Sequence, residues 1–222
     1  KNGRTGVWTI AAQQSGVISD NHGLVVSAGA ISKLAIDTPK RFLRSGSMRD
    51  YLTNVPQVFE ADLQDSFSNP SPSTFTVIAG LSVLRNPSLF LDSYDFSASS
   101  TMITESYPPA GPPKFVTSIA TLTFAPAQTY ATFYYLDTMA SYSYGASSAT
   151  RPQIFISVAE QPTWTMASQV IDVRPGGIAK MNFINPTRTL LAGTTSEAFT
   201  LALNDAFGNV SPNPNPGDIS FN

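Results

Sequence analysis

Aspartate and asparagine recur four positions apart in two similar segments, and these side chains are the best placed in the sequence to do chemistry. One segment, Asp-Ser-Phe-Ser-Asn, runs from Asp65 to Asn69, and the other, Asp-Ala-Phe-Gly-Asn, runs from Asp205 to Asn209. Closely spaced carboxylate and amide oxygens suit a hard cation, so these four residues are candidate Ca²⁺ ligands. The alternative is a β-turn, in which Asp and Asn bond the local backbone and Gly208 supplies a positive φ. No glutamate follows where an EF-hand loop needs one, so we predict turns and no metal site.

Catalytic constellations are missing from the sequence. The absence of cysteine excludes disulfides, thiolate zinc sites, iron–sulfur clusters and cysteine nucleophiles. The single histidine, His22, is expected in a hydrophilic loop, and no Gly-x-Ser-x-Gly motif accompanies it. The acidic residues Asp92, Asp95 and Glu105 lack the paired strand context that would fix a carboxylate separation for glycoside hydrolysis. We therefore predict no catalytic residue, no cofactor and no enzymatic activity.

Aromatic side chains offer a candidate ligand surface. A flat stacking platform for a sugar could draw on Tyr94, Tyr107, Tyr134 and Trp164. Aromatic residues along a strand more often fill a core or pair across strands. Alternation around Phe133 places Tyr134 on the face opposite its two neighbours, so a small exposed aromatic patch is a second hypothesis.

Charge and hydropathy exclude two classes of partner. The 222 residues include 13 basic and 15 acidic side chains, giving a net charge of −2 and no electrostatic basis for binding nucleic acid or an anionic membrane. No run of about eighteen apolar residues occurs, so we expect no membrane insertion. Charged residues make up 13% of the chain, against roughly 25% in typical domains.

The elements that must position these residues are strands. In several short stretches rich in β-branched and aromatic residues, apolar and polar residues alternate along the chain. Gly, Pro, Asn or Ser bounds each stretch. The 17 prolines would interrupt long helices. The sequence therefore predicts an all-β sandwich. The expected strands cover residues 7–11, 24–26, 34–36, 58–63, 74–78, 120–124, 132–136, 154–158, 170–173, 181–184 and 199–203.

An internal repeat organises the chain. Residues 26–39 align with residues 173–186 at an offset of 147, and residues 59–69 align with residues 199–209 at an offset of 140. The alignment divides the chain into three parts. Residues 1–30 are the final strands of one unit, residues 31–177 a complete unit with insertions, and residues 178–222 the first strands of the next unit.

The repeat resembles a known family. A Gly-bearing linker, a Lys-apolar-x-apolar strand, a second strand and then Asp-x-Phe-Gly-Asn resemble tandem bacterial immunoglobulin-like repeats, found in invasin- and intimin-type adhesins and other large bacterial surface proteins. Residues 120–138 are similar to the strand, Pro-turn and strand of that family, and Ser68 stands where the family has Gly. The resemblance implies immunoglobulin-like sandwiches in tandem and brings no catalytic residues.

These observations predict a non-enzymatic structural segment of a large extracellular or cell-surface bacterial protein, such as a stalk, fibre or adhesin shaft. The alternative is a carbohydrate- or receptor-binding sandwich, with host or surface glycans as ligands. The insertions at residues 80–118 and 147–163 separate the two hypotheses. Aromatic residues exposed together there would favour binding, and packing of the insertions on the sandwich would favour a shaft.

The terminal parts carry a further expectation. A two-stranded piece is marginal in water and leaves unpaired edges, so both ends read as cut. We expect neighbouring units, or other copies of the chain, to complete them by strand pairing, which would build a filament head to tail. The strand alternation also predicts that Phe59, Leu63, Phe199 and Leu203 face a core.

Overall fold

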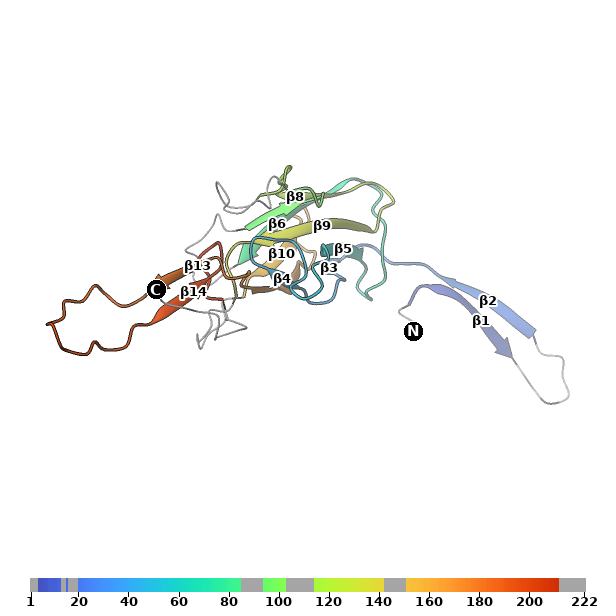
Figure 1. The fold of residues 1–222 in the computed structure, drawn as a ribbon. Coiled ribbons are helices and arrows are strands. Elements are labelled where there is room, and N and C mark those ends of the chain that lie inside the picture. Colours follow the sequence, from blue (N-terminus) through green and yellow to red (C-terminus); the bar gives the residue numbers. More distant parts are fainter. Residues whose placement is uncertain are drawn as a thin grey trace.

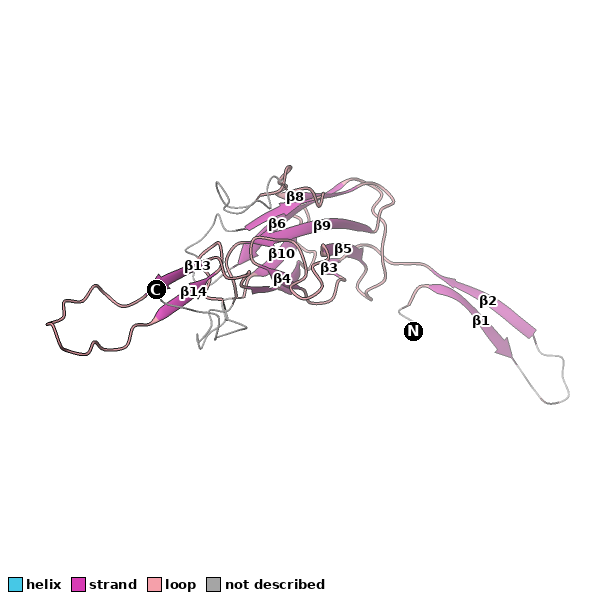
Figure 2. Cartoon of the chain, viewed as in Figure 1, coloured by secondary structure: helices cyan, strands magenta, loops and turns pink. Residues whose placement is uncertain are grey.

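The computed structural model describes residues 4–12, 15, 20–84, 94–102, 114–141 and 151–211 (Figure 1). The regular elements of these residues are strands, with no helix among them (Figure 2), and hence no helix that could cross a membrane. In chain order they are β1 (Gly6–Ala12), β2 (Asp20–Val26), β3 (Lys33–Ile36), β4 (Phe42–Arg44), β5 (Val58–Gln64), β6 (Val77–Leu84), β7 (Tyr94–Ser97), β8 (Thr121–Phe124), β9 (Tyr130–Asp137), β10 (Gln153–Ser157), β11 (Ala167–Val170), β12 (Asp172–Arg174), β13 (Lys180–Phe183) and β14 (Leu201–Asn204).

Two antiparallel four-stranded sheets form the body of the molecule. One has the strand order β3-β5-β9-β7 and the other the order β11-β10-β6-β8. Alternation decides which side chains each strand buries, because successive residues point to opposite faces. On β9, Phe133 and Tyr135 are fully buried and Tyr134 between them is half-exposed, as the sequence predicts.

Both sheets bury their apolar faces in one main core. Phe59 of β5 stacks on its cross-strand partner Phe133 of β9, with 5.2 Å between ring centroids. The second sheet contributes Ile154 and Ile156 from β10. The buried members of this cluster run from Leu34 to Val173, so residues 31–177 contain the whole of it. They are Leu34, Leu43, Phe59, Ala61, Leu63, Val77, Ala79, Phe96, Leu122, Phe124, Phe133, Tyr135, Ile154, Ile156, Val158, Ala167, Ile171 and Val173.

Two hairpins extend from opposite ends of this body (Figure 1). Strands β1 and β2 pair antiparallel at the N-terminal end, and β13 and β14 do so at the C-terminal end. Each hairpin is a separate two-stranded sheet with exposed apolar side chains, including Val7 at 78% and Met181 at 61% exposure. Their apolar faces therefore lie outside the main core.

The sequence predicted most strands to within a few residues, but four expectations are wrong. Residues 74–76 of the strand expected at 74–78 precede β6. The strand expected at 170–173 is divided at Ile171, which lies between the end of β11 and the start of β12, and β12 pairs in parallel with β4. His22 lies within β2, opposite Ile10, rather than in a loop. Phe199 precedes β14 and is 53% exposed, because no second sheet of the described residues covers the β13–β14 hairpin.

The burial of Leu63 gives a direct test of the core. Leu63 is completely buried on β5, so Leu63→Ala should lower the free energy of unfolding by about 2–5 kcal/mol. Leu52 is 84% exposed, and the matched Leu52→Ala should cost less than about 0.5 kcal/mol. Chemical denaturation monitored by circular dichroism measures both values. Equal effects of the two substitutions would contradict the assigned core.

Candidate functional site: two matched Asp–Asn turns

The Asp65 turn, residues 65–71, is built around a buried carboxylate. Oδ1 of Asp65 accepts hydrogen bonds from the backbone N–H groups of Phe67 at 2.8 Å and Asn69 at 2.9 Å. Oδ2 accepts the N–H of Gly29 at 2.9 Å, and the Asn69 amide donates to both oxygens. The carboxylate therefore ties its own turn to a residue 36 positions earlier in the chain.

Ser71 completes the hold on Gly29. Its hydroxyl donates to the Gly29 carbonyl oxygen at 2.7 Å. Both backbone polar groups of this glycine are thus bonded to the Asp65 turn. Lys33 adds an exposed contact, donating from Nζ to Ser68 Oγ at 2.6 Å. The segment between β2 and β3 is consequently fixed in position by side chains of the turn.

The Asp205 turn, residues 205–211, repeats this arrangement. Oδ1 of Asp205 accepts the N–H groups of Phe207 and Asn209, each at 2.9 Å. Oδ2 accepts the N–H of Gly176 at 2.9 Å and the Asn209 amide at 2.8 Å. The Ser211 hydroxyl donates to the Gly176 carbonyl at 2.8 Å, as Ser71 does to Gly29. Gly29 and Gly176 are separated by the offset of 147 residues, and Asp65 and Asp205 by the offset of 140 residues, at which the two repeat blocks align.

The two turns also share a left-handed position. Ser68 has φ of 67° and Gly208 has φ of 90°. Glycine enters this region without steric cost, whereas a serine there is strained. Ser68 therefore has the same left-handed backbone conformation as Gly208, but with conformational strain that the glycine does not have.

The Asp65 carboxylate is held in its ionised form. Its hydrogen bond with the Asn69 side chain, followed by those from the backbone N–H groups of Gly29, Asn69 and Phe67, lowers the pKa of Asp65 well below its usual range against the opposing effect of burial. The oxygens proposed from the sequence as cation ligands are thus occupied by N–H donors in both turns. This arrangement stabilises the chain path, and it presents no nucleophile and no acid–base pair.

A second group of carboxylates, Glu60 and Asp62 on β5 and Asp37 directly after β3, was not predicted from the sequence. Carboxylate oxygens of Asp37, Glu60 and Asp62 lie within 4.8 Å of one another and could together hold a cation. Burial, followed by repulsion from Glu60 and Asp37, raises the pKa of Asp62 to about 6. A sequence signal existed, because Glu60 and Asp62 share one face of a strand.

The aromatic candidates do not converge. Tyr94 packs against Phe96 and Tyr135 on the core side of its sheet, and Trp164 packs against the same core. Tyr134 lies opposite Ser97 and packs against the smaller cluster of Met48, Phe115 and Leu136. Tyr94 and Tyr134 therefore occupy opposite faces of one sheet. Tyr107 lies outside the described residues.

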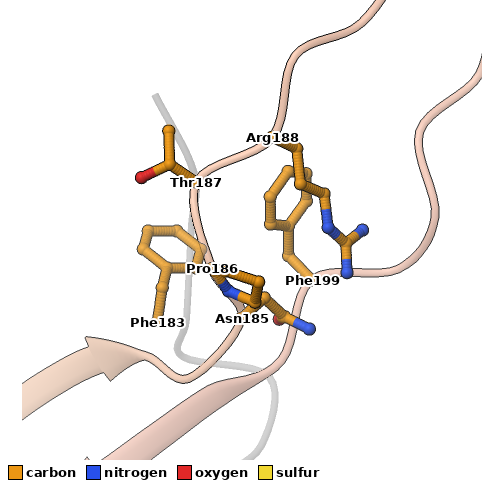
Figure 3. Close-up of a pocket in the computed structure, with 6 residues that line it drawn as sticks. All are labelled: Phe183, Asn185, Pro186, Thr187, Arg188 and Phe199. Carbon is orange, nitrogen blue, oxygen red and sulfur yellow. The ribbon is translucent and has the colours of Figure 1, made fainter.

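A hollow at the base of the β13–β14 loop has two aromatic walls, Phe183 and Phe199 (Figure 3). Their ring centroids are 5.8 Å apart and nearly perpendicular. Arg188 lies over the Phe199 ring at 5.0 Å and pairs with Glu197 at 3.5 Å. Asn185 accepts the backbone N–H of Thr200. The side chains of Arg188 and Asn185 thus have partners within the loop.

The comparisons with known proteins show little similarity. No protein-family model matches the chain, and neither does any curated protein. The solved structures include two segments of the surface layer protein SbsC. Domains 1–6 align at 12% identity with a TM-score of 0.33, covering 93% of this chain and 20% of that one. Domains 4–9 align at 13% identity and 0.33, covering 94% and 25%.

A β-glycosidase from Bacteroides vulgatus aligns at 14% identity with a TM-score of 0.36, covering 77% of this chain and 18% of that one. The chain therefore spans a quarter or less of each of these proteins. Similarities at such TM-scores carry no argument about function.

The left-handed position yields a paired prediction. Replacing the strained serine by Ser68→Gly should stabilise the Asp65 turn by up to about 1 kcal/mol, and Gly208→Ala should destabilise the Asp205 turn by about 1–2 kcal/mol. A Cβ at Gly208 would meet no atom of the described residues within 4 Å, so we attribute the second effect to backbone conformation. Native-state hydrogen exchange at the Asn69 and Asn209 amides measures both. Effects of the same sign would contradict the equivalence of the two positions.

The raised pKa of Asp62 predicts a distinct pH dependence. A pKa of about 6 in the folded state exceeds the unfolded value of about 3.9, so Asp62 favours folding below about pH 4 and loses this contribution as pH rises through 6. Asp62→Asn should remove this loss and stabilise the protein at pH 7 by on the order of 1 kcal/mol, after allowance for screening by solvent.

Denaturation at several pH values measures this effect, and Asp50 provides a control of opposite sign. Hydrogen bonds, the one from the Thr53 backbone first, lower the pKa of Asp50. Its contribution is therefore present above about pH 4 and lost as pH falls. A stability profile of Asp62→Asn that keeps the wild-type slope between pH 4 and 7 would contradict the assignment.

Proposed function

We propose that this chain is a non-enzymatic structural segment of a bacterial cell-surface protein, made of immunoglobulin-like β-units in tandem. In this proposal residues 31–177 are a complete unit between the final strands of one unit and the first strands of the next. The observation that carries the proposal is the repeated turn. Asp65 holds Gly29 and Asp205 holds Gly176 through the same set of hydrogen bonds.

The hold on the linkers supports a stiff shaft. Gly29 and Gly176 stand in the segments that enter the second and third parts of the chain. A glycine linker is ordinarily flexible. Here both polar groups of each glycine are bonded to the following turn. Bending at either linker would break charge-assisted hydrogen bonds, so consecutive units keep one relative orientation.

The arrangement of the strands supports the same function. The two hairpins leave the body at opposite ends (Figure 1), as tandem units in a line require. Tyr94 in the first insertion and Trp164 next to the second pack on the core, which favours a shaft over a glycan-binding surface. In this proposal neighbouring units or other copies cover the exposed hairpins by strand pairing. The shaft then lies outside the cell, as a stalk, fibre or adhesin shaft does.

A distance measurement between labels tests the proposal on the whole chain. The sequence has no cysteine, so spin labels can be attached at Thr123→Cys on β8 and Met181→Cys on β13, both exposed. A shaft predicts a narrow distance distribution by electron double resonance. Asp205→Asn should broaden it, because neutralising the carboxylate weakens the hold on Gly176.

Asp65→Asn is the matched control. It makes the same chemical change at the other linker, so it should leave the distance between positions 123 and 181 narrow. A broad distribution in the chain without these Asn substitutions would contradict a stiff shaft. A distribution unaffected by Asp205→Asn would show that the turn does not set the orientation.

A further inference from the structure

Phe67 and Phe207 occupy equivalent positions in the two turns but have different surroundings. Phe67 is 64% exposed, whereas Phe207 is half-buried. The ring of Phe207 lies against Gly46, so closely that a Cβ built on Gly46 would be 2.2 Å from two ring carbons. Gly46 has φ of 70°, so its backbone conformation also favours glycine. The Phe207 ring thus lies where only a glycine surface fits.

The serine before this glycine joins the Asp205 turn as well. Ser45 is buried, and its hydroxyl donates to Oδ2 of Asp205 at 2.5 Å and accepts the N–H of Gly176 at 2.9 Å. The Ser45–Gly46 segment is itself held in place by the N–H of Gly46, which donates to the Asp137 carbonyl at 2.7 Å. Ser45 and Gly46 therefore form a Ser–Gly surface shaped for the Asp–Phe pair of the Asp205 turn.

The asparagine side chain of each turn accepts a hydrogen bond from the backbone of an earlier part of the chain. Oδ1 of Asn209 accepts the N–H of Ala140 at 2.8 Å, and its amide donates to the Thr138 carbonyl at 2.8 Å. Oδ1 of Asn69 accepts the N–H of Thr5 at 3.1 Å. In both turns the same amide oxygen takes a backbone N–H from the preceding part of the chain. The Asp65 turn thus makes the same asparagine contact to the preceding part of the chain as the Asp205 turn does.

We propose that Phe67, exposed at the Asp65 turn, is the docking surface for the Ser–Gly turn of a preceding repeat unit. The occupant is a segment equivalent to Ser45–Gly46, with its glycine on the Phe67 ring, as Gly46 lies on the Phe207 ring. The inference rests on the proposed tandem organisation. It extends that function by naming the contact through which one unit recognises the next.

An engineered, duplicated protein supplies the occupant for a test. In it, residues 1–177 are followed directly by residues 31–222, so that the second copy of residues 31–177 follows a complete unit with its own core. Since the sequence has no cysteine, Phe67→Cys introduces a single thiol, placed in either copy. Its rate of reaction with a small aromatic disulfide reports exposure. Phe67→Cys in the second copy should react at least tenfold more slowly than in the first.

The two copies of residue 67 are matched controls for each other, since they differ in what precedes them. Gly46→Ala in the first copy should restore fast reaction at position 67 of the second copy, because its methyl group would meet the residue docked there. Phe207→Cys in the unduplicated chain gives the rate for a covered position. Hydrogen exchange of residues 65–71, in the duplicated protein without cysteine, provides a measurement that needs no substitution at Phe67.

Equal thiol rates in the two copies, or equal exchange of the two 65–71 segments, would overturn the docking surface. Spin labels at Thr123→Cys of the first copy and Thr123→Cys of the second separate this outcome from a failure of the proposed function. A narrow distance with a reactive residue 67 would leave the shaft intact and reject the docking. A broad distance would reject the shaft itself.

Discussion

A buried carboxylate that binds the backbone of a distant glycine is the interaction on which the arrangement of this molecule depends. Removing an ionised carboxylate from water is costly unless hydrogen bonds replace its hydration. Asp65 and Asp205 are each 1% exposed, and each receives N–H donors from its own turn and from a linker glycine. The donors that stabilise the charge are therefore the same groups that define the chain path. The local turn and the linker cannot be rearranged independently of each other.

The sequence revealed the local half of this interaction and not the remote half. The spacing of Asp and Asn predicts a turn because the Asp side chain bonds backbone N–H groups two and four residues further on. The repeat alignment marked both linker glycines. Nothing in a local pattern indicates that Ser45 meets Asp205 across 160 residues, or that Asn209 meets Ala140 across 69. Such contacts depend on the positions in which the sheets place the loops.

The fold shows the same division. Alternation identified Phe59 and Leu63 as core residues, since β5 is central in its sheet and an opposing sheet covers it. The same pattern failed at Phe199, since the part of the chain that the structure describes has no sheet covering the β13–β14 hairpin. Periodicity reports which side chains share a face, and only the surroundings decide whether that face is buried. The two halves of the repeat therefore differ in burial although they share a pattern.

Asp62 and Asp65 show how position along one strand and its following turn reverses the effect of burial on a carboxyl group. Asp62 lies on β5 beside Glu60 and Asp37, so burial and like charges raise its pKa to about 6. Asp65 follows the end of that strand, where free backbone N–H groups converge and lower the pKa. A carboxylate within a sheet faces N–H groups that are already paired with neighbouring strands, whereas a turn offers unpaired donors. The end of β5 is thus where a buried charge can stabilise the chain, and Asp205 follows the end of β14 in the same way.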